Sequence, residues 1–105
     1  MYFRQTLQGL TSRGFYNHVP EALEGLGLTT SELGDPRRAA VLLGAGEAQR
    51  EALNTNLTSE EWDRLTHELA PIRCALHERE FADAWNEGRA MTLEQATAYA
   101  LETQP

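Results

Sequence analysis

The sequence predicts an all-α fold of five or six helices in a single domain of 105 residues. Apolar residues recur at spacings of three and four along several segments, as they do on one face of an amphipathic helix. No segment alternates apolar and polar residues over the length of a strand, and two capping boxes mark helix starts. Because periodicity, capping and turn chemistry agree, we expect a helical hairpin at about 20–53, packed with a C-terminal helical cap at about 58–102.

The hairpin, from Pro20 to Leu53, is predicted from an apolar face and from the turn that follows it. Gly34 suits the left-handed position just past a helix, Asp35 can cap the next helix, and Pro36 is tolerated in its first turn. The second helix is rich in Ala and Gly, so helix axes can approach to the short end of the roughly 8 to 10 Å range. The face of the first helix that we expect to be buried consists of Ala22, Leu23, Leu26, Thr30 and Leu33.

Two capping boxes place later helices. One helix begins after Thr58, with Glu61 three residues on, and Leu57 and Trp62 stand at the positions of a hydrophobic staple. The other capping box, Thr92 to Gln95, starts the last helix. The residues of the last helix expected to face inward are Leu93, Ala96, Ala100 and Tyr99.

Between the two boxes, Pro71 predicts a kink, because it removes a backbone hydrogen bond and clashes with the preceding turn. Phe81, Ala84 and Trp85 then predict a short helix that Gly88 ends, with Trp85 buried. The two Trp residues could form a binding platform, but their spacing favours positions in the core.

The composition limits the compartment and the class of partner. The net charge is −7, and nucleic-acid affinity comes mainly from clustered basic residues, so we expect no direct contact with nucleic acid and no binding to anionic membranes. No apolar run approaches the roughly 20 residues that span a bilayer. A single cysteine, Cys74, cannot form an internal disulfide, and no secretion signal opens the chain. We therefore expect a cytoplasmic protein.

No catalytic, cofactor-binding or metal site can be assembled from the sequence. Gly44-Ala45-Gly46 imitates a dinucleotide fingerprint, but Gln49 stands where a third small residue is needed, and a helix start replaces the strand. His67 and Cys74 are roughly 10 Å apart along one helix, too far to share an ion bound at about 2 Å. Cys74 with His77 alone does not make a zinc site. We expect close helix packing at the glycines, a half-buried Cys74 and surface histidines.

The hairpin resembles a tetratricopeptide repeat, a family of paired helices stacked into a superhelix. Thr30 departs from the family pattern, where an aromatic residue is usual, and Glu51 stands where a closing Pro is usual. The positions that match the pattern are Leu23, Leu26, Gly27, Leu33, Gly34, Asp35, Ala39, Leu43 and Gly46.

Nearly the whole chain, from about Arg4 to Glu102, resembles the C-terminal end of bacterial multidomain signalling ATPases and LuxR-type transcriptional regulators. The residues that carry this resemblance, in order, are Phe81, Trp85, Gly88, Arg89, Leu93, Ala96 and Leu101. It implies a remnant helix of a preceding repeat at 1–13, a tetratricopeptide-like hairpin at 16–54 and C-terminal capping helices at 57–105. The chain contains no Walker motif and no helix-turn-helix, so ATPase and DNA-binding activities are not carried over.

The resemblance implies a non-catalytic protein–protein interaction module, a fragment or remnant of a larger regulator, with no cofactor. The alternative is a small helical ligand-binding protein or enzyme whose pocket lies between helices. We also expect a homodimer, because the first helix of the preceding repeat is absent and its apolar stripe would be uncovered. The alternative there is that this short helix folds back on the hairpin or frays. The candidate self-association residues are Tyr2, Phe3, Leu7 and Leu10.

Overall fold

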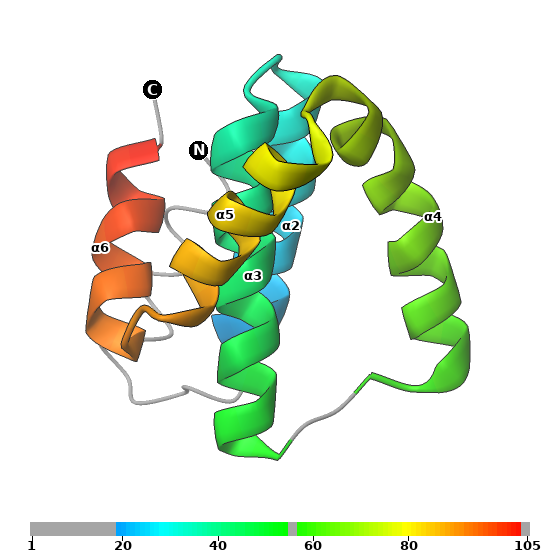
Figure 1. Ribbon diagram of the computed structural model, residues 1–105. Helices are drawn as coiled ribbons and strands as arrows, with labels where there is room; N and C mark the ends of the chain where they lie inside the picture. Colours follow the sequence, from blue (N-terminus) through cyan, green and yellow to red (C-terminus); the bar gives the residue numbers. More distant parts are fainter. Residues whose placement is uncertain (1–18, 55–56, 104–105) are drawn as a thin grey trace.

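The computed structural model describes residues 19–54 and 57–103, which form five α-helices and no strand (Figure 1). The prediction of an all-α fold is confirmed. The predicted N-terminal helix and the self-association residues Tyr2, Phe3, Leu7 and Leu10 lie outside the described residues. The helices are α2 (Val19–Glu32), α3 (Pro36–Leu53), α4 (Ser59–Ala75), α5 (Glu78–Arg89) and α6 (Leu93–Thr103).

Helix α3 is the centre of the fold, and the other helices surround it. In Figure 1, α2 runs antiparallel behind α3, α5 crosses in front of it, and α4 and α6 stand on opposite sides. One apolar cluster joins α2, α3 and α6 around Leu23, Leu42 and Ala96. A second cluster joins α3, α4 and α5, where Val41 and Ile72 are both almost fully buried. Opposite sides of α3 therefore belong to two different clusters.

The predicted helix signals are present as hydrogen bonds. The Asp35 side chain accepts a bond from the backbone N–H of Arg38, and Gly34 has a φ of +93°, where glycine is favoured. Both capping boxes form: Thr58 exchanges bonds with Glu61, at 3.0 and 3.2 Å, and Thr92 does so with Gln95, at 2.9 and 3.1 Å. These local interactions fix where α3, α4 and α6 begin.

Glycines allow α3 and α5 to touch through their backbones. A Cβ added at Gly88 would lie 1.9 Å from the carbonyl oxygen of Val41, and one added at Gly44 would lie 2.2 Å from that of Trp85. Real Cβ atoms do not approach so closely, so only glycine fits at either position. The prediction of close helix packing at Gly44 is confirmed. Gly88 lies inside α5 and does not end it, because the helix continues to Arg89.

Leu33 and Trp85 were predicted to be buried, and neither is. Leu33 is 70% exposed, because α2 ends at Glu32 and the chain then reverses at Gly34. Trp85 is half-buried. The face of α5 that meets α3 is centred on Gly88, and Trp85 projects about 100° round the helix from Ala84, beside that contact.

Two predictions for α4 are also wrong. Trp62, expected in the core, is 46% exposed, because the buried residues of α4, Leu69 and Ile72, lie in the second half of the helix. Cys74, expected to be half-buried, is exposed. It lies two residues beyond Ile72, about 200° round the helix, and so faces away from the core. Pro71 lies inside α4, and Figure 1 shows the helix bending near this end. No described helix combines the length and apolarity needed to cross a bilayer.

Candidate functional site

The inner side of α4 borders three neighbouring cavities of about 650, 270 and 190 Å³. Trp62 and Glu47 line both of the larger two, and Leu57 and Arg50 line both of the smaller two. The cavities therefore form one groove, between α4 on one side and α2, α3 and α5 on the other, which we call the α4 groove. Its main apolar lining residues are Leu57, Trp62, Leu65, Leu69, Phe81 and Trp85.

Aromatic side chains form the wider end of the groove. The rings of Phe81 and Trp85 on α5 stack with centroids 5.6 Å apart and an angle of 29° between their planes. The Arg73 guanidinium of α4 lies 4.9 Å from the centroid of the Phe81 ring, within reach of a cation–π interaction. With Trp62 nearly half exposed on the α4 side, this end presents both aromatic and cationic contact surface.

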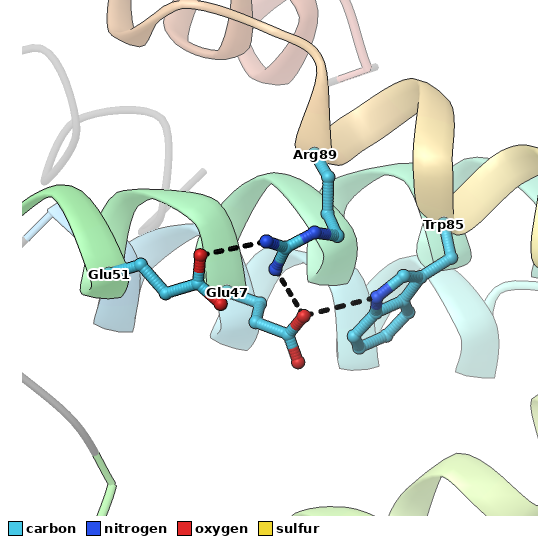
Figure 2. A network of polar contacts seen from close by, with 4 residues as sticks. All are labelled: Glu47, Glu51, Trp85 and Arg89. Carbon is cyan, nitrogen blue, oxygen red and sulfur yellow. Dashed lines mark hydrogen bonds and ion pairs between the residues drawn. The ribbon is translucent and has the colours of Figure 1, made fainter.

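Arg89 of α5 holds α5 against α3 at the edge of the groove (Figure 2). Its guanidinium donates to Glu47 and, at 2.7 Å, to Glu51, which lie one helical turn apart on α3. The indole N–H of Trp85 donates to the same Glu47 oxygen at 3.4 Å. Because both α5 side chains converge on Glu47, the position of Trp85 in the groove is coupled to this network.

The hydrogen bond that Arg89 donates to Glu51 lowers the pKa of Glu51 and raises the pKa of Arg89. At Glu61, the hydrogen bond from the backbone N–H of Thr58 lowers the pKa of the carboxyl group. Both carboxylates are therefore held in the charged form.

A second ion pair ties α3 to α2 beside the groove. Arg50 donates two parallel bonds to Glu24, at 2.7 and 2.8 Å, and these side chains are only 13% and 14% exposed. Hydrogen bonding to the Glu24 carboxylate raises the pKa of Arg50. This bidentate geometry fixes the direction of both side chains, so the rigid wall of the groove includes charged groups.

Carboxylates outnumber guanidinium groups along the groove. Partners of opposite charge are thereby favoured, and acidic partners are disfavoured. The charged lining residues are the carboxylates of Glu21, Glu24, Glu47, Glu51, Glu61, Glu68 and Glu78 and the guanidinium groups of Arg50, Arg64 and Arg73.

Within residues 19–54 and 57–103, no group of three or more His, Cys, Asp or Glu side chains could hold a metal ion. His67, Cys74 and His77 are all exposed. Gly44 and Gly46 pack against α5 and α2. The α4 groove, with its apolar lining and charged rim, is suited to holding another molecule by burial and ion pairing.

The groove and its ion pairs were not predicted from sequence. Arg89 is 42 residues from Glu47 and 38 from Glu51, and Arg50 is 26 from Glu24. One signal was available: Trp85 and Arg89 are four residues apart on one helix, so they share a face. Trp62 and Trp85, which were considered as a possible binding platform, both line the groove.

Comparison with known proteins gives a partial match. No family model matches the chain. No solved structure matches it either. Over 86 residues, 81% of its length, the chain is 31% identical to a helix-turn-helix (HTH)-type transcriptional regulator of Mycobacterium tuberculosis, strain H37Rv, and equally to one of Mycobacterium bovis. The chain covers 10% of the length of these relatives.

The match supports the coarser part of the predicted resemblance, a relation to transcriptional regulators. It contradicts the prediction of no direct contact with nucleic acid, because the relatives are named as HTH-type transcriptional regulators, a class that typically binds DNA. The prediction was drawn from a net charge of −7, which is a property of this segment alone. It does not describe the contacts of regulators of which the matched residues make up 10%. The chain is thus similar to part of an HTH-type transcriptional regulator.

Proposed function

We propose that the chain is a non-catalytic protein–protein interaction module, similar to part of a bacterial transcriptional regulator, and that α2 and α3 form a tetratricopeptide-like hairpin within it. The single observation that carries the proposal is the α4 groove, which places a nearly half-exposed Trp62 opposite the aromatic pair of α5. Trp and Arg dominate the binding energy of protein interfaces, and both line this groove.

The charged rim supports the same function. Glu47, Arg89 and Trp85 are fixed by hydrogen bonds between α3 and α5, so a partner would meet an ordered surface. An ordered surface loses less side-chain entropy on binding than a mobile one. The relation to transcriptional regulators fits a module that transmits a signal through protein contacts.

The competing function is a small helical ligand-binding protein or enzyme with its pocket between helices. The cavity of about 650 Å³ favours this function, because its volume lies within the roughly 300 to 1,000 Å³ that is typical of small-molecule pockets. A thermal-shift screen against nucleotides and metabolites tests this function, because a ligand at a hundredfold its dissociation constant adds about 2.7 kcal/mol of stability. Reproducible shifts that disappear in a Trp62→Ala variant would favour the small-molecule function.

Site-specific photo-crosslinking in cells of the source organism tests the interaction function. A photoreactive amino acid replaces Trp62 in the groove or His67, which is exposed on α4 and does not line the groove. We expect a discrete protein adduct from position 62, absent from position 67 and lost when Leu65→Glu is added. Adducts of equal yield from both positions, or none from position 62, would contradict the proposal.

A further inference from the structure

We propose that the partner of the α4 groove is a basic amphipathic helix, with Leu-like side chains on one face and Arg or Lys beside them. This inference rests on the proposed interaction function and specifies the chemistry of the partner. Three features of the groove support it: its helical walls, its apolar lining and its excess of carboxylates.

The walls favour a helical partner. The groove lies between α4 and α2, α3 and α5, and the backbone N–H and C=O groups within a helix are already bonded to one another. An extended peptide would find no strand edge here, and its own backbone groups would lose water without gaining partners. A helix satisfies its own backbone groups and buries only side chains.

Along α4, the groove has the length of a short helix. The lining residues of α4 extend from Glu61 to Arg73, thirteen residues that span about 18 Å along the helix axis. A partner helix of about 12 to 14 residues would match this length. Its apolar side chains, repeated at three- and four-residue spacing, would contact Trp62, Leu65 and Leu69 on one side and Phe81 and Trp85 on the other.

The carboxylates select the charge of the partner. Glu68 and Glu78 line the groove, and neither forms an ion pair within the part of the chain that the structure describes. A partner that covers the groove removes water from these carboxylates, which is costly unless it brings cations. Arg or Lys on the flanks of the partner helix would supply them, whereas an acidic helix would be repelled.

Designed peptides provide the probe. The first is a 14-residue helical peptide with Leu on one face and Arg on its flanks. The second replaces each Arg by Glu, and the third replaces each Leu by Ser. The chain has two Trp residues and both line the groove, so intrinsic fluorescence reports binding there, and calorimetry gives the affinity. We expect the first peptide to bind at least about tenfold more tightly than either of the others.

Charge variants of the full chain locate the contact. Glu68→Gln with Glu78→Gln should weaken binding of the basic peptide about tenfold, the effect of two partly exposed ion pairs. The matched control is Asp63→Asn with Asp83→Asn, the same charge change on exposed residues of α4 and α5 that do not line the groove. The control should leave the affinity unchanged. Circular dichroism establishes that both variants retain their helices.

Equal affinity for the basic and acidic peptides would overturn the inference, and so would equal loss of affinity in the two charge variants. If position 62 crosslinks to a protein in cells while the basic peptide fails to bind, the partner chemistry is wrong and the interaction function stands. If neither crosslinking nor peptide binding occurs, both proposals fall.

Discussion

At the scale of single residues, Gly88 sets the distance between α3 and α5. The carbonyl oxygen of Val41 and the backbone nitrogen of Ala45 would lie 1.9 and 2.7 Å from a Cβ at this position. Both atoms belong to the backbone of α3, which cannot rotate away as a flexible side chain could. A methyl group would therefore have to separate the helices.

Replacing Gly88 by Ala should destabilise the protein by about 1 to 3 kcal/mol or more, although Ala is the better helix former by about 1 kcal/mol. Denaturant unfolding monitored by Trp fluorescence measures the change. Asp83→Ala, at an exposed position of the same helix, is the control and should lie within about 0.5 kcal/mol of the parent chain. A Gly88→Ala variant as stable as this control would mean that α3 and α5 are not in backbone contact.

The ion pair between Glu51 and Arg89 should make stability depend on pH. The hydrogen bond from Arg89 lowers the pKa of Glu51 in the folded protein, so the folded state favours the carboxylate. The contribution is present above the pKa of Glu in the unfolded chain, and it is lost as the pH falls through the lower folded pKa. Glu51→Gln should reduce stability at about pH 7, and this effect should shrink as the pH is lowered through the folded pKa of Glu51.

Urea unfolding across this pH range measures the difference between the parent chain and Glu51→Gln. In an Arg89→Met background, the same substitution should have no effect at any pH, because the donor to Glu51 is gone. An undiminished difference in that background would show that Arg89 is not the partner of Glu51.

At the scale of helices, the N-terminus of α4 depends on its capping box, which two hydrogen bonds between Thr58 and Glu61 close. Thr58→Ala should lower the stability of α4 by about 1 kcal/mol, because the backbone N–H of Glu61 loses its acceptor. Hydrogen exchange of the α4 amides measures the effect. Ser59→Ala, one residue further on and also exposed, is the control and should change protection little. Equal effects of the two substitutions would contradict a specific role of the box.

Helix positions could be predicted from sequence because their signals are local. Asp35, Thr58 and Thr92 act on residues three positions away, and the turn at Gly34 depends on its own φ. These interactions are the same in any fold that contains the helices. The starts of α3, α4 and α6 were accordingly predicted to within a residue or two.

The orientation of single side chains could not be predicted equally well. The apolar periodicity of α4 is compatible with a core position for Trp62. Whether Trp62 is buried, however, depends on whether another helix packs against that end of α4. The same is true of Trp85, whose neighbour Ala84 takes the contact with α3. The α4 groove depends in the same way on where α4 lies relative to α2, α3 and α5. The pairs Arg89–Glu47 and Arg50–Glu24 join residues that are far apart in the sequence.

At the scale of the whole molecule, α3 is covered on opposite sides, whereas α4 is attached along one part of its length. Nine residues of α3 are buried, against Leu69 and Ile72 in α4. Both apolar clusters include residues of α3, and α4 contributes to only one of them. Local opening of a helix costs less free energy where it buries fewer apolar side chains. The α4 groove is therefore bounded by one firmly held wall and one more easily displaced wall.

Native-state hydrogen exchange should show this difference directly. We expect amides of α3 to exchange only by global unfolding, with a steep dependence on denaturant, and amides of α4 to open at a free energy at least about 1 kcal/mol lower and with a shallower dependence. Ile72→Ala removes the most buried side chain of α4 and should reduce protection in α4 more than in α3. The matched control, Ala70→Gly, tests helix propensity at an exposed position of α4. If α3 and α4 share one opening free energy and one denaturant dependence, then α4 unfolds with the rest of the molecule, and a partner helix would meet two equally rigid walls.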